Sequence, residues 1–130
     1  EIYLKGFEIC IKEAAPKNLM TSYNKINGVW GHYHYDLCTT ILRGEWEYKG
    51  NVMTDWWMQS SKSPENPAVK DQAYRVRAQV DLFMPGAARV NNGKPDGTLL
   101  SSYGKPFGIT LGEIQRSAMN ILRSAMEIKL

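Results

Sequence analysis

Apolar residues recur at helical spacing in four segments of the chain, and each segment predicts a helix. The first covers residues 1–14 and ends before Pro16, because proline cannot continue a helix. The second covers residues 36–45, and the third runs from about residue 67 to residue 79. The fourth begins after Thr110 and has the clearest pattern.

This last predicted helix carries both a start signal and a long apolar stripe. Thr110 is followed three residues later by Glu113, which is the capping-box pattern of a helix N-terminus. Apolar residues then recur at helical spacing at Leu111, Ile114, Ala118, Ile121, Leu122, Ala125 and Ile128. The pattern therefore predicts a long amphipathic helix.

Three short apolar runs lie between the helices and predict buried strands within residues 17–23, 51–54 and 80–84. Alternating helices and strands favour a parallel sheet with right-handed crossovers. A closed barrel needs eight such strands, so three are too few. The predicted fold class is α/β, with about three parallel strands alternating with helices, either as a small open sheet or as a partial (β/α) barrel. The open edges of a partial barrel would need partners.

Two stretches between these elements carry turn and loop signals. Asn27 and Gly28 form a turn dipeptide a few residues after the first predicted strand. Residues 87–108 are rich in Gly, Asn, Pro and Ser, and the stretch is long for a connection inside a compact domain. We expect it to be a functional or insertion loop.

The composition is typical of a globular domain and excludes several function classes. The 130 residues fit one domain, with 43% hydrophobic and 22% charged residues. A net charge of +3 without a run of basic residues gives no sign of a nucleic-acid arm or a polybasic membrane patch. Cys10 and Cys38 lie far apart without metal-type spacing, which predicts two buried thiols in a reducing compartment.

The candidate chemistry centres on Asp55, which directly follows the predicted strand at residues 51–54. In a parallel sheet, a residue just past the carboxyl end of a strand faces the ligand site. Trp56 and Trp57 follow it, and an indole can cover the apolar face of a sugar ring. A carboxylate in this place suits glycoside hydrolysis. By composition alone, a helix N-cap or a structural ion pair explains Asp55 about equally well.

For several other polar residues, a structural role is an alternative to a role in a functional site. Tyr23 ends the first strand and either faces the site or binds a backbone carbonyl group. His32 and His34 stand two residues apart in a loop, but no further cluster of ligands supports a metal pair, so we expect ordinary loop histidines. We interpret Asp81 and Arg43 as structural charges.

Four motifs, in this order along the chain, resemble glycoside hydrolase family 3 of the β-glucosidase type. They are LMTSYNKINGV at 19–29, ILRGEW at 41–46, GNVMTDW at 50–56 and DLFMPG at 81–86. The resemblance covers essentially the whole chain. It implies the C-terminal half of a catalytic (β/α)8 barrel, with its last three strands near residues 18–22, 51–54 and 80–84.

The resemblance also implies a mechanism and a set of site residues. Family members retain anomeric configuration through a covalent glycosyl-enzyme, and Asp55 stands where their nucleophile stands. Tyr23 stands where relatives carry a tyrosine near the nucleophile. Met20 lies in the segment that lines the sugar pocket, and Trp56 matches an aromatic residue that contacts sugar. No cofactor and no metal are implied.

The resemblance is incomplete in two respects. Nothing matches the Arg and the Lys-His pair that relatives use to grip sugar hydroxyls, and these come from earlier barrel strands. The acid/base glutamate usually comes from a separate α/β sandwich domain, so Glu45 and Glu47 are not candidates for it. The partners implied are a β-glucoside or oligosaccharide substrate, the remainder of the barrel and the sandwich domain.

Three functions therefore stay open on the sequence. The first is the nucleophile-bearing part of an exo-β-glycosidase, most simply a β-glucosidase, with a β-xylosidase-type enzyme as its variant. The second is an isolated non-catalytic scaffold fragment, which could form homo-oligomers through its open edges. The third is a small α/β binding module unrelated to hydrolysis.

Overall fold

The computed structural model describes residues 2–56, 58, 72–85 and 97–128. Its strands are β1 (Asn18–Met20), β2 (Lys25–Ile26), β3 (Val29–Trp30) and β4 (Asn51–Met53). Its helices are α1 (Lys5–Ile9), η1 (Cys10–Ala14), η2 (Gly31–Tyr33), η3 (Asp36–Glu45), α2 (Ala73–Arg77), α4 (Thr98–Ser102) and α5 (Leu111–Met126). Within the described ranges, no helix has the length and apolar character needed to cross a bilayer.

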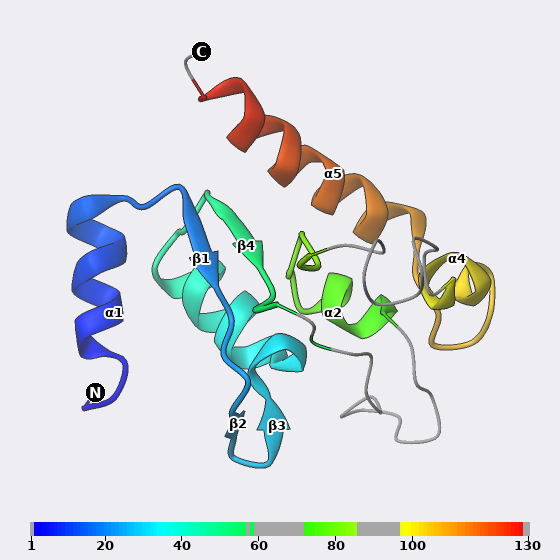
Figure 1. The fold of residues 1–130 in the computed structure, drawn as a ribbon, viewed down its shortest axis with the longest axis horizontal. Coiled ribbons are helices and arrows are strands. Elements are labelled where there is room, and N and C mark those ends of the chain that lie inside the picture. Colours follow the sequence, from blue (N-terminus) through cyan, green and yellow to red (C-terminus); the bar gives the residue numbers. More distant parts are fainter. Residues whose placement is uncertain (1, 57, 59–71, 86–96, 129–130) are drawn as a thin grey trace.

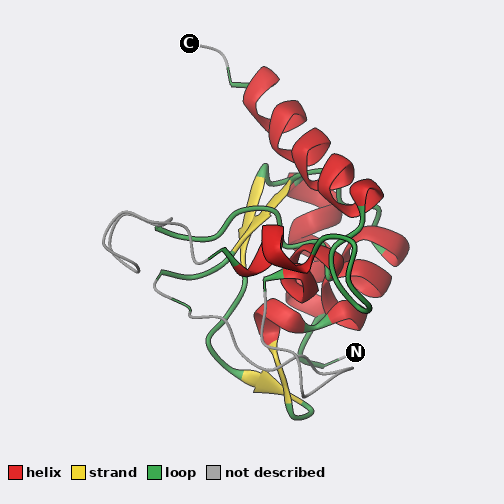
Figure 2. Ribbon diagram, turned by 90° about the vertical axis from the view of Figure 1, so that its right-hand side faces the viewer, coloured by secondary structure: helices red, strands yellow, loops and turns green. Residues whose placement is uncertain are grey.

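The parallel strand pair β1–β4 lies at the centre of the molecule (Figure 1). Asn18 pairs with Asn51, and Met20 pairs with Met53. The prediction of a third regular strand at residues 80–84 is wrong. This segment forms only a single parallel bridge, between Leu82 and Met53. Figure 2 shows the helices gathered mainly to one side of the β1–β4 pair.

Side-chain oxygens explain why the third strand shrinks to one bridge. The backbone N–H of Val52 donates to the carboxylate of Asp81 at 3.1 Å. The backbone N–H of Met84 donates to the hydroxyl of Thr54 at 2.9 Å. In a regular parallel ladder, both groups would bond to backbone carbonyls of the facing strand. The regular pairing therefore stops on both sides of Leu82.

The hairpin of β2 and β3 was not predicted as strands, although its turn was. Asn27 and Gly28 connect the two strands with φ angles of 49° and 84°. Two successive positive φ angles are typical of a type I′ turn, and Asn-Gly is its preferred sequence. The hairpin follows β1 at the end of the molecule to which β1 and β4 point (Figure 1).

The first, second and fourth predicted helices are confirmed. Residues 5–14 are helical through α1 and η1, and Ala15 ends the helix with a left-handed φ of 45°. The range Asp36–Glu45 is η3, which has π-helical hydrogen bonding. At α5, Thr110 accepts a hydrogen bond from the N–H of Glu113, whose carboxylate accepts one from the N–H of Thr110.

The third predicted helix and the predicted loop at residues 87–108 are only partly described. Within the helix at 67–79, α2 accounts for Ala73–Arg77, and residues 67–71 lie outside the described residues. Within the loop, Thr98–Ser102 form the short helix α4, which the Gly- and Ser-rich composition did not indicate. Residues 87–96 lie outside the described residues.

The hydrophobic core lies between β4 and the helices beside it. Val52 and Val80 are fully buried there, and Cys38 and Leu42 contribute the buried face of η3. The expectation of two buried thiols is confirmed for Cys38 and wrong for Cys10, which is exposed. Burial raises the pKa of the Cys38 thiol to about 12, so this side chain behaves as a small apolar residue.

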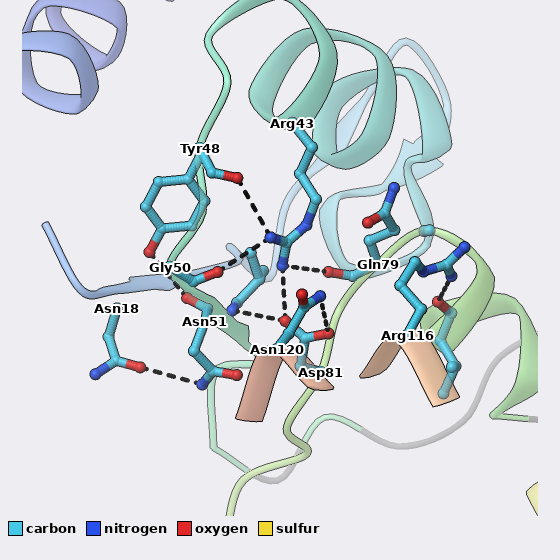
Figure 3. A network of polar contacts seen from close by, with 12 residues as sticks. Asn18, Arg43, Tyr48, Gly50, Asn51, Gln79, Asp81, Arg116 and Asn120 are labelled. Atoms are coloured by element: carbon cyan, nitrogen blue, oxygen red, sulfur yellow. Dashed lines mark hydrogen bonds and ion pairs between the residues drawn. The ribbon is translucent and has the colours of Figure 1, made fainter. Parts of the chain in front are cut away.

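A buried carboxylate, Asp81, joins three elements through three polar contacts (Figure 3). Its Oδ2 accepts from the Arg43 guanidinium at 2.7 Å and from the N–H of Val52 at 3.1 Å. Its Oδ1 accepts from the side-chain amide of Asn120 at 3.0 Å. Arg43 also donates to the carbonyl of Gly50 at 3.1 Å. Asp81 and Arg43 are therefore structural, as expected.

Burial of Asp81 opposes this ion pair. It raises the pKa of the Asp81 carboxyl despite the lowering effects of Asn120, Arg43 and the N–H of Val52. A buried charge of this kind is tolerated only when its partners are all present, because removing one partner leaves an unpaired charge in the interior.

We expect Asp81→Ala to lower the free energy of unfolding by about 3–5 kcal/mol, since it leaves Arg43 without its carboxylate and Val52 without an acceptor. Urea denaturation followed by tryptophan fluorescence measures this change. Lys12→Ala is the matched control, because Lys12 and Glu8 form an exposed ion pair with the same 2.7 Å separation. That control should lower the free energy of unfolding far less, because an exposed ion pair contributes little to stability. Equal losses in the two variants would contradict a structural role for the Asp81 network.

Candidate functional site

Asp55 lies just beyond the carboxyl end of β4, two residues after Met53. Its side chain is partly exposed, and its Oδ1 accepts a hydrogen bond from the N–H of Trp56 at 2.6 Å. Within the described residues, Oδ2 accepts no hydrogen bond from the protein. Asp55 therefore presents one carboxylate oxygen that is oriented by the backbone and one that is available to a ligand.

Two buried threonines hold the strand ends directly beneath Asp55. Thr21 donates its N–H, at 2.9 Å, and its hydroxyl, at 3.3 Å, to the carbonyl of Met53. Thr54 donates its N–H to the carbonyl of Leu82 at 2.9 Å, and its hydroxyl accepts from the N–H of Met84. These contacts join the end of β4 to its neighbours on both sides.

The other predicted site residues lie at the same end of the sheet. Met20 pairs with Met53, so both side chains lie on one face of the strand pair. Met20, Tyr23 and Trp56 are 53%, 49% and 44% exposed, which leaves all three accessible. The structure therefore brings Met20 and Asp55 to neighbouring strand ends, with Trp56 next to Asp55 and Tyr23 just after β1. A hydrogen bond between Tyr23 and Asp55 is not among those of the described residues.

A fully buried arginine, Arg75, was not identified from the sequence. Its Nε donates to Nδ1 of His32 at 2.8 Å, and its Nη1 donates to the carbonyl of Met58 at 3.1 Å. Its guanidinium lies 5.1 Å from the ring of Tyr33 and 5.5 Å from the ring of Phe83. The available signal was an arginine inside the small apolar stretch of α2.

Arg75 connects segments that follow three different strand ends. His32 and Tyr33 directly follow β3, Met58 comes after Asp55, and Phe83 follows the bridge at Leu82. Because one guanidinium contacts all three, it supports the backbone around the candidate site without belonging to it.

Both histidines accept hydrogen bonds from other parts of the chain. Burial and the nearby charge of Arg75 lower the pKa of His32 to about 3, so the ring is neutral and its Nδ1 is an acceptor. His34 accepts a hydrogen bond at Nδ1 from the N–H of Leu37 at 3.3 Å. Among the described residues, no group of three or more His, Cys, Asp or Glu side chains could hold a metal ion.

A hollow of about 270 Å³ lies at the opposite end of the strands from Asp55. Lys17, Glu47 and Gly50 line it, at the amino ends of β1 and β4. Ligands of parallel sheets bind at the carboxyl ends of strands, so we place the functional site at Asp55 despite the size of this hollow.

Comparison with known proteins identifies relatives along nearly the whole chain. Residues 1–123 match the model described as the glycosyl hydrolase family 3 N terminal domain. The chain is 40% identical over 126 residues to a β-glucosidase of Ruminococcus albus, an alignment that covers 97% of this chain and 13% of that protein. It is 44% identical over 89 residues to β-glucosidase B of Emericella nidulans, covering 68% of this chain and 9% of that protein. The chain thus spans a small part of the length of these relatives.

Solved structures agree with the sequence matches. A β-glucosidase from Paenibacillus barengoltzii superposes with a TM-score of 0.77 at 45% identity, covering 95% of this chain and 14% of that one. β-Glucosidase 3B from Thermotoga neapolitana, solved in complex with glycerol, superposes with a TM-score of 0.79 at 30% identity. That alignment covers 97% of this chain and 16% of that one.

The lowered pKa of His32 predicts a specific pH dependence of stability. Below pH 6.5, His32 binds a proton in the unfolded chain but not in the folded chain. The free energy of unfolding therefore falls as the pH drops towards 3. The fall is about 1.4 kcal/mol per pH unit in this window. His32→Asn should reduce the difference in stability between pH 7.5 and pH 5 by about 2 kcal/mol, measured by urea denaturation at both pH values. An unchanged pH dependence in this variant would show that His32 is not the group responsible.

Proposed function

The chain belongs to glycosyl hydrolase family 3, and from this membership we propose that the protein is a retaining β-glucosidase whose nucleophile is Asp55. The observation that carries the proposal is the position of Asp55, past the carboxyl end of β4 with one carboxylate oxygen open to a ligand. Four motifs of this family occur in order along the chain, and the relatives named above are β-glucosidases.

The proposed reaction has two steps. In the first, Oδ2 of Asp55 attacks the anomeric carbon and forms a glycosyl ester, while the bond from that carbon to the leaving oxygen breaks. The leaving oxygen takes a proton from an acid/base glutamate outside this chain. In the second, water gives a proton to the same glutamate and attacks the anomeric carbon, which releases Asp55 as a carboxylate and restores the β configuration. The hydrogen bond from the N–H of Trp56 to Oδ1 fixes the orientation of the carboxylate for this attack.

Three neighbouring side chains are proposed to bind the sugar. The exposed indole of Trp56 is suited to covering the apolar face of a pyranose. Met20 would line the pocket beside β4, and the hydroxyl of Tyr23 would bind the nucleophile or a sugar hydroxyl once substrate is present. A terminal, non-reducing β-D-glucosyl residue is the proposed substrate, and a β-xyloside is the alternative.

We further propose that the chain is the C-terminal half of a catalytic (β/α)8 barrel. The carbonyl of Lys17 and the N–H of Thr21 bond to β4, so the N–H groups of Asn18 and Met20 point away from it. Next to this open edge lies an apolar groove of about 180 Å³, lined by residues of α1, β1 and η3. An unpaired edge beside an apolar groove is what a missing neighbouring strand would leave.

The remaining parts of the protein would complete the active site. The first half of the barrel would supply the residues that grip the sugar hydroxyls, and an α/β sandwich domain would supply the acid/base glutamate. An isolated chain of these 130 residues would then be a non-catalytic fragment, with its open edge available for self-association.

Incubation of the full-length protein with an activated 2-deoxy-2-fluoro-β-glucoside tests the nucleophile. Fluorine slows hydrolysis of the glycosyl ester, so we expect a stable adduct on the peptide that contains Asp55, identified by peptide mass analysis. Asp55→Asn should abolish the adduct and lower kcat by about 10⁴-fold or more on an aryl β-glucoside, because the amide is not a nucleophile.

Two controls make this test specific. Asp36→Asn changes an exposed carboxylate on η3, and it should leave the adduct and kcat unchanged. Trp56→Ala should raise KM while the adduct still forms on Asp55. An adduct on a different peptide, or normal turnover by Asp55→Asn, would refute the assignment.

Hydrogen exchange of β1 tests the partial barrel. The N–H of Met20 points to the open edge, so we expect slow exchange in the full-length protein and fast exchange in the isolated chain. Thr21 is the matched control, because its N–H bonds to Met53 in either case. Fast exchange at Met20 in the full-length protein would mean that no strand covers this edge.

A further inference from the structure

We propose that Thr54 is a positioning residue whose buried hydroxyl fixes the orientation of Asp55. The proposal rests on the proposed role of Asp55 as nucleophile. In this proposal, Thr54 does not contact the substrate. It only fixes the backbone from which the side chain of Asp55 projects.

The geometry around Thr54 is unusual for the end of a parallel strand. The residue is fully buried, and its N–H donates to the carbonyl of Leu82 at 2.9 Å, as a regular ladder requires. The N–H of Met84 should then bond to a backbone carbonyl on β4, but it donates to Oγ1 of Thr54 at 2.9 Å instead. The hydroxyl has replaced a backbone acceptor.

This replacement has a direct consequence for Asp55. Since the hydroxyl satisfies the N–H of Met84, the backbone of β4 can leave the ladder at Thr54 and turn. The next residue is Asp55, whose Oδ1 is in turn held by the N–H of Trp56. Thr54 is thus the last residue anchored to the neighbouring segment before the nucleophile. The anchor consists of two hydrogen bonds that end two residues apart, at Leu82 and Met84.

Attack at an anomeric carbon depends strongly on such an anchor. A displacement of about 1 Å at the reacting atoms can cost about 100-fold in rate, even when binding is unchanged. Loss of the hydroxyl should therefore lower the rate of glycosyl-enzyme formation more than the affinity for substrate.

Three threonine variants of the full-length protein separate positioning from folding. Thr54→Val keeps the β-branched shape and removes the acceptor for Met84. Thr54→Ser keeps the hydroxyl. Thr21→Val is the matched control, because Thr21 is also buried at a neighbouring strand end, but its own N–H already bonds to the carbonyl that its hydroxyl contacts.

The readouts are the rate constant for labelling by the 2-deoxy-2-fluoro-β-glucoside, the final amount of adduct, and kcat and KM on an aryl β-glucoside. For Thr54→Val we expect labelling and kcat to fall about 10–100-fold, with KM within about threefold of the unchanged protein. The final adduct should still approach one per molecule, which shows that the variant is folded. Thr54→Ser should recover most of the rate, and Thr21→Val should lose about threefold or less.

The outcomes are distinguishable from failure of the proposed function. If the unchanged protein forms no adduct on Asp55, the nucleophile assignment fails before Thr54 is tested. If it does form one, then labelling of Thr54→Val at the original rate overturns the positioning role. Equal losses in Thr54→Val and Thr54→Ser, or in Thr54→Val and Thr21→Val, would also overturn it.

Discussion

The carboxylate of Asp81 is the interaction on which the described fold depends most. A negative charge in the interior is costly unless each lone pair meets a donor, and here the donors come from η3, β4 and α5. Arg43 joins the same contact to the turn before β4 through the carbonyl of Gly50. One side chain therefore fixes how the long C-terminal helix, the π-helix and the central strand meet, and apolar packing fills the space around it.

Regular elements with a strong periodic signal could be predicted from the sequence, while elements governed by side-chain hydrogen bonds could not. The helix of residues 111–126 was predicted because Thr110 and Glu113 cap it locally. The strand at residues 80–84 was predicted from its apolar residues, yet it is reduced to a bridge by the carboxylate of Asp81 and the hydroxyl of Thr54. Apolar patterns carry no information about contacts of this kind, which form only after distant segments meet.

The candidate site divides in the same way. Asp55 could be proposed from the sequence because a carboxylate directly after a buried strand, followed by two indoles, is a local pattern, and the resemblance to relatives supports the proposal. The residues that support the backbone around Asp55 could not be predicted from the sequence. In the sequence, nothing distinguishes Arg75 from an exposed charge on a helix. Only the folded chain shows that it contacts His32, Met58 and the ring of Phe83.

The two hydrogen bonds of Thr54 also bear on how such a protein can diversify. They anchor the candidate nucleophile to a segment directly beside it in the sheet, through Leu82 and Met84. Changes in other segments around the site can then alter which molecules reach it while the candidate nucleophile keeps its place. A short, buried anchor of this kind would allow substrate selectivity to change while the position of the carboxylate stays constant.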